Sequence, residues 1–266
     1  MNMYLYELKS LRKSTLIWTL SLVALAFIYF SIYPSIASDA EDFKQLLSAY
    51  PEPIRAALGI SLESITSLLG FYSMVFSIIS LTGAIQAMIL GTSILSKEAR
   101  DRTADFLLVK PVSRTSIISA KLSAAITILL ITNILYDLIA FIMASVVATT
   151  DYSKKQFFLI SLTLFFIQLI FLAVGLFLSV FFQKLRSVLP ISLGVVFGLY
   201  MIGAILATGE KDVARYLSPF KYFNIPYIME HSGYETSYLF VSAIIVVISI
   251  VGSYLVYSKK DIHAVS

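Results

Sequence analysis

Six long apolar segments constrain the fold of this 266-residue chain more than any other feature. Each is about as long as the ~20 residues that a helix needs to cross ~30 Å of hydrocarbon. They cover residues 14–33, 64–95, 115–149, 156–182, 187–207 and 237–257. Hydrophobic residues make up 58% of the sequence and charged residues 14%, which excludes an ordinary soluble domain. We expect an all-α polytopic membrane protein with six transmembrane helices, formed by residues 1–266 as a single domain.

Basic residues indicate which side of the membrane the loops face. Six spans place both termini on one side, and the segments of that side hold thirteen Lys and Arg against five Asp and Glu. The opposite side holds seven basic and ten acidic residues. Since basic loops remain in the cytoplasm, both termini are expected there, next to the headgroups of membrane lipids. This asymmetry accounts for the pI of about 9.1, so a nucleic-acid partner is not indicated.

The segments outside the spans suggest short helices. Tyr4, Leu5, Leu8 and Leu11 recur at helical spacing, with Lys9 on the opposite side, which predicts an interfacial elbow helix rather than a frayed tail.

The outer loops are rich in proline. Pro34, Pro51 and Pro53 predict one or two short helices with turns at the prolines. Pro219 and Pro226, among many aromatic residues, predict short re-entrant or interfacial outer helices between spans five and six.

Several kinds of chemistry have no motif in the sequence. The chain has no cysteine and two distant histidines, so neither a disulfide nor a metal site is expected. It contains no H-E-x-x-H or G-x-S-x-G motif, so no catalytic residue is assigned. None of its eleven glycines precedes a lysine, so it lacks a phosphate-binding P-loop. If ATP drives this protein, another subunit must bind the nucleotide.

Polar residues within the spans are few. Gln86, Asp137 and Gln168 could line a path or pack between helices. Asp137 is expected near the outer end of its span, paired with Asn133 or Tyr136 and serving packing, with a coupling or substrate role as the alternative. Lys121 is expected to extend its amine to the headgroups.

Residues 96–121 form a polar segment between two apolar stretches that would each be ~50 Å long as helices. Glu98 to Leu108 can form a short amphipathic helix, which Pro111 would end. Ser113 is suited to cap the third span. The segment is therefore predicted to be a rigid cytoplasmic docking element, with a solvated loop that only fixes topology as the alternative.

This segment resembles the first cytoplasmic loop of ABC-2 type transporter permeases. The shared residues follow a pattern that begins with Glu, continues through T-x-x-x-L-L to P-x-S-R, and ends in I-I-x-x-K; they are Glu98, Thr103, Leu107, Leu108, Pro111, Ser113, Arg114, Ile117, Ile118 and Lys121. Arg102 stands where the family commonly has glycine. Residues 218–222 also resemble an S-P-F-x-Y segment that many bacterial members carry between spans five and six.

The resemblance implies a bacterial cell-membrane exporter in which the loop helix is a coupling helix. It would dock on a nucleotide-binding ATPase subunit, present in two copies that bind ATP and Mg²⁺, so this chain itself would hold no cofactor. A second permease, identical or different, would complete the translocation path, lined by spans one, two and five. The residues assigned to ATPase coupling are Glu98, Arg100, Arg102, Thr103, Phe106, Leu107, Pro111, Ser113 and Arg114.

Two further expectations concern the assembly and the cargo. Gly194 and Gly198 stand in G-x-x-x-G register and predict a close helix or dimer contact. Spans rich in aromatic and aliphatic side chains suit an amphipathic cargo, and the exporters of phenol-soluble modulins are one related group. Peptide export is therefore favoured, with a non-transporting membrane anchor or sensor as the alternative.

Overall fold

The computed structural model describes residues 3–57, 60, 62, 64–100, 113–181, 187–206 and 212–259, and these residues form helices without any strand. Five of the helices in this part of the chain are long and apolar enough to cross a membrane. They are α1 (Met3–Ser38), α4 (Leu68–Arg100), α6 (Arg114–Val147), α7 (Lys154–Phe181) and α10 (Thr236–Lys259). The expected fifth span is α8 (Leu189–Leu206), which has 18 residues and is ~27 Å long. The all-α membrane class is confirmed, whereas a count of six full spans stays a prediction.

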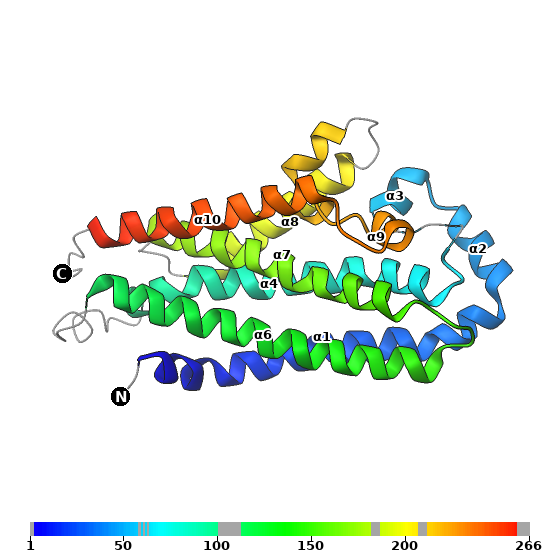
Figure 1. The fold of residues 1–266 in the computed structure, drawn as a ribbon, viewed down its shortest axis with the longest axis horizontal. Coiled ribbons are helices and arrows are strands. Elements are labelled where there is room, and N and C mark those ends of the chain that lie inside the picture. Colours follow the sequence, from blue (N-terminus) through cyan, green and yellow to red (C-terminus); the bar gives the residue numbers. More distant parts are fainter. Residues whose placement is uncertain are drawn as a thin grey trace.

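The long helices lie side by side, with α4 and α7 at the centre (Figure 1). In the most apolar 18-residue stretch of α4 and of α7, 61% of the residues are buried, compared with 17% in that of α10. In Figure 1, α1 and α6 flank this pair on one side and α8 and α10 on the other. The start of α1 and the end of α10 lie at the same end of the bundle. We call this the inner end, because the basic residues predict that it faces the cytoplasm.

Two glycines allow α4 and α7 to touch. A Cβ atom on Gly91 would lie 2.4 Å from the carbonyl oxygen of Leu172, and one on Gly175 would lie 2.8 Å from that of Met88. The two backbones are therefore in direct contact, as small residues allow in membrane helices. Gly194 and Gly198 of α8 differ, because a Cβ on either would have no atom within 4 Å among the described residues. Their predicted contact is not made within this part of the chain.

The N-terminal segment is not a separate elbow helix. Helix α1 continues unbroken from Met3 to Ser38 and includes Pro34, where a turn was expected. Packing supports the continuous helix around this proline, since Phe30 and Tyr33 are buried and the rings of Tyr33 and Phe71 lie 5.4 Å apart. Membrane helices tolerate a proline when neighbouring groups compensate for its missing hydrogen bond.

The outer segments form the short helices that their prolines predict. Helices α2 (Ala40–Ser48) and α3 (Glu52–Ala57) are separated at Pro51. Between α8 and α10 lie η1 (Asp212–Leu217), η2 (Pro219–Lys221) and α9 (Ile225–His231). Asn224 caps α9, its side chain accepting a hydrogen bond from the Tyr227 backbone N–H at 3.3 Å. A re-entrant position in the membrane stays a prediction.

Candidate functional site

A buried ion pair joins three helices at the inner end of the bundle. Lys121 Nζ of α6 lies 2.9 Å from Glu7 Oε1 of α1, and the two side chains are 1% and 4% exposed. The same amine donates to the carbonyl oxygen of Ile94 in α4 at 2.8 Å. The expectation that Lys121 reaches the headgroups is therefore wrong, because its amine turns inward to a carboxylate and a carbonyl. Glu7 was missed, although it is the only acidic residue among the first 38.

The predicted coupling residues, Glu98 to Arg114, lie in the chain between Ile94 and Lys121, the two ends of the amine–carbonyl contact. Ser113 is confirmed as the cap of α6, because its Oγ accepts a hydrogen bond from the Ser116 backbone N–H at 3.2 Å. Arg114 is the first residue of α6 and is half-buried. Glu98 and Arg100 belong to the last turn of α4 rather than to a separate loop helix. The other coupling residues lie outside the described part of the chain: Arg102, Thr103, Phe106, Leu107 and Pro111.

Buried amides form a second group near the middle of the bundle, which we call the amide chain. Asn133 Nδ2 donates to Gln168 Oε1 at 2.5 Å, and Gln168 Nε2 donates to Gln86 Oε1 at 3.0 Å. Gln86 Nε2 then donates to Thr132 Oγ1 at 3.4 Å, and the Thr132 and Thr19 hydroxyls lie 3.1 Å apart. The structure thus brings Gln86 and Gln168 together and links α6, α7, α4 and α1. The sequence did not reveal Asn133 as the start of this chain.

A cleft of about 40 Å³ lies between Gln86 and the inner end of the bundle. Helices α1, α4 and α6 line it, whereas α8, the expected fifth span, does not. The lining combines hydroxyl, amide and apolar groups: Leu11, Ser14, Thr15, Trp18, Gln86, Ile89, Leu90, Ser93 and Ile128. Trp18 is the only tryptophan of the chain. The cleft thus exposes polar and apolar groups from three helices side by side.

The surroundings of Asp137 differ from the expected packing pair. Its Oδ1 atom is buried and has no hydrogen-bond partner among the described residues. Asn133 instead donates to Gln168, and the Tyr136 hydroxyl lies 2.8 Å from the Tyr72 hydroxyl. The structure records no hydrogen bond from Asp137 to Asn133 or Tyr136, because the Asn133 amide N–H groups and the Tyr136 hydroxyl bond to other groups; the pairing stays a prediction.

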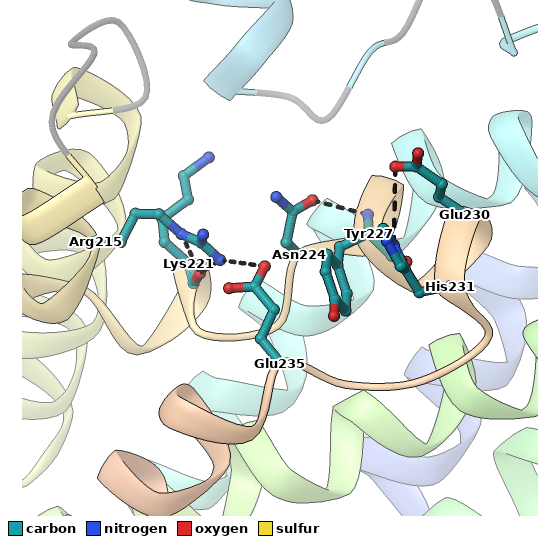
Figure 2. A network of polar contacts seen from close by, with 7 residues as sticks. All are labelled: Arg215, Lys221, Asn224, Tyr227, Glu230, His231 and Glu235. Atoms are coloured by element: carbon teal, nitrogen blue, oxygen red, sulfur yellow. Dashed lines mark hydrogen bonds and ion pairs between the residues drawn. The ribbon is translucent and has the colours of Figure 1, made fainter.

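A polar cluster covers the outer end between α8 and α10 (Figure 2). Arg215 donates to Glu235 Oε1 at 3.0 Å and to the Lys221 carbonyl oxygen at 3.2 Å, and its guanidinium carbon lies 4.2 Å from the Tyr238 ring centre. Burial, followed by the charge of Arg215, lowers the pKa of Lys221. Burial raises the pKa of Tyr234 to about 12. The cluster ties the η1–η2 segment to the start of α10.

The described residues include no cluster of His, Asp and Glu that could hold a metal ion. The sequence model of the family described as ABC-2 family transporter protein matches residues 1–262, nearly the whole chain. The chain belongs to the ABC-2 transporter family. Members of this family are multi-pass membrane permeases, the membrane component of a transporter rather than its ATPase. No curated protein matches the chain.

Proposed function

We propose that this ABC-2 protein is the permease subunit of an ATP-driven exporter. It pairs with a second permease, identical or different, above two copies of an ATPase subunit that bind ATP and Mg²⁺. The main support for this proposal is the contact of Lys121 with Glu7 and with the Ile94 carbonyl, which joins α6, α1 and α4 next to the coupling segment. A load applied between α4 and α6 would therefore reach α1 as well. Basic inner loops support cytoplasmic termini and an inner-face docking site.

The docking surface is tested with the double variant Glu98→Ala, Arg102→Ala. We expect it to reduce both co-purification of the ATPase subunit and the ATPase activity that the permease stimulates. The matched control is Asp151→Ala, Lys155→Ala, which removes one exposed acid and one exposed base from the opposite end of the bundle. Docking at the predicted segment is refuted if the two double variants behave alike.

The cargo proposed is an amphipathic peptide, since the cleft of about 40 Å³ offers one side chain of the peptide a lining of polar and apolar groups. Trp18 lies in this lining as the chain's only tryptophan, so tryptophan fluorescence reports on the surroundings of this one position. A helical amphipathic peptide should shift the Trp18 emission and stimulate ATP hydrolysis, whereas sodium ions should do neither. Trp18→Phe removes the optical signal and serves as the blank.

Two results would contradict this cargo. One is an emission shift that lipid alone reproduces, and the other is a shift without ATPase stimulation, which would favour a non-transporting sensor.

A further inference from the structure

Asp137 lies in an outer layer of the bundle where the nearby hydroxyl groups already have partners. The Tyr72 hydroxyl bonds to those of Tyr136 and Ser161, each at 2.8 Å, and the Tyr234 hydroxyl donates to the Leu159 carbonyl at 2.6 Å. Tyr72, Tyr136 and Tyr234 lie close enough to interact with the charge of the carboxyl. None of these hydroxyl groups donates to the buried Oδ1 atom of Asp137.

No positive charge compensates this carboxyl in the described part of the chain. Asp137 takes part in none of the ion pairs between described residues, which include Lys121 with Glu7, Arg215 with Glu235, and His231 with Glu230. The apolar lengths of the helices that pack on α6 carry no charged residue at all: residues 14–38 of α1, 68–96 of α4, 156–181 of α7 and 236–258 of α10. On α1, the titratable groups of the outer half are Tyr29 and Tyr33, and the Tyr33 hydroxyl donates to the Thr66 carbonyl. An ionised Asp137 would be an uncompensated charge.

A second buried acceptor without a partner lies one helical turn away. The Oδ1 atom of Asn133 is buried, and no described residue donates to it. The orientation of this amide is fixed, because its Nδ2 donates to the Leu129 carbonyl at 2.8 Å and to Gln168. Each hydrogen bond of the amide chain therefore runs in the same donor-to-acceptor direction, from Asn133 to Gln168, to Gln86 and to Thr132. Asn133 Oδ1 is the acceptor without a donor at the start of the chain. Residues four apart on a helix are neighbours on its surface.

One proton placed between the two side chains satisfies both acceptors, Asp137 Oδ1 and Asn133 Oδ1. We propose that Asp137 binds a proton from water and donates it, as a neutral carboxylic acid, in a hydrogen bond to Asn133 Oδ1. The acid then completes the amide chain at its head, and aligned hydrogen bonds strengthen one another in an apolar interior. A metal ion fits less well, because it needs several converging oxygen ligands and the described residues supply no such cluster.

The proton site is connected to the cleft through the amide chain. If Asp137 loses its proton, the carboxylate attracts the Asn133 amide hydrogens, which now bond to Gln168. Turning that amide breaks the first bond of the chain and releases Gln168 and then Gln86, which lines the cleft. Occupancy of the site by a proton therefore sets the hydrogen bonding of a cleft side chain.

Infrared spectroscopy of the full chain in lipid nanodiscs at pH 7 tests the proton directly. The difference spectrum between wild type and Asp137→Asn should contain the carbonyl band of a protonated carboxylic acid. Asn133→Leu should shift this band, because the acid loses its acceptor. A difference spectrum that contains only carboxylate bands overturns the proposal, and so does a band that Asn133→Leu leaves unmoved.

Carbodiimide labelling provides a second measurement with an internal control. Dicyclohexylcarbodiimide modifies protonated carboxyls in apolar surroundings, and Glu7 is a buried carboxyl that is ion-paired instead. Mass spectrometry should find clear labelling of Asp137 and little of Glu7, because the reagent needs a protonated carboxyl and the Glu7 carboxyl is paired with Lys121. Labelling of Asp137 that does not exceed that of Glu7 contradicts the proposal.

Discussion

The Lys121–Glu7 pair allows a quantitative prediction about the inner end of the bundle. Lys121→Met removes the amine and leaves the Glu7 carboxylate buried without its partner, while the Ile94 carbonyl loses its second donor. Breaking a buried ion pair from one side costs about 3–5 kcal/mol. For a chain of this size, that loss corresponds to a fall in Tm of roughly 6–20 °C.

The assay is thermal unfolding of the purified chain in detergent, followed by the fluorescence of Trp18. The double variant Glu7→Gln, Lys121→Met should recover most of the lost stability, because no charge then remains buried without a partner. Lys154→Met is the matched control, since Lys154 is exposed at the start of α7 and its removal should change stability by less than about 0.5 kcal/mol. The reasoning is refuted if Lys121→Met unfolds at the same temperature as Lys154→Met, or if the double variant is as unstable as the single one.

Two other predictions use the same unfolding assay. Gly175→Leu should strongly destabilise the chain, because its Cβ would already lie 2.8 Å from the Met88 carbonyl, whereas Gly198→Leu on the open face of α8 should not; equal losses would contradict the α4–α7 contact. Lys221→Met should stabilise the chain at neutral pH, because burial and the charge of Arg215 lower the pKa of the folded lysine. Below the usual lysine pKa of 10.5, the unfolded chain therefore binds more protons at Lys221 than the folded chain does. The wild type gains stability as the pH rises towards that value, so the stability advantage of Lys221→Met should shrink. An advantage that grows with pH would be inconsistent with a lowered pKa.

The sequence predicted local features well. Apolar length identified the five long membrane helices, Ser113 was correctly predicted to cap α6, and Pro51 correctly marked a break between two short helices. These features depend on the chain's own propensities, so neighbouring residues are enough to predict them. The predicted turn at Pro34 was wrong, because burial of α1 against α4 outweighs the local effect of the proline.

The sequence could not show which polar residues meet. Glu7 and Lys121 are far apart in the chain, as are Gln86 and Gln168, and only the helix packing brings each pair together. The sequence placed Asn133 and Tyr136 beside Asp137, but it could not show that the Asn133 amide N–H and the Tyr136 hydroxyl bond to other helices. Partner choice among buried polar groups is a property of the packed bundle, and periodicity within one helix does not contain it.

The contact between Gly91 and Gly175 has a consequence for the synthesis and membrane insertion of the protein. Helices α4 and α7 are not consecutive, because α6 enters the membrane between them. During synthesis, the face of α4 that carries Gly91 therefore stays exposed to lipid until α7 has been inserted. A chain interrupted before α7 would carry an unpaired central helix, and exposed association surfaces of this kind are what lead to misassembly. Translation and insertion must proceed past Phe181 before the centre of the bundle can close.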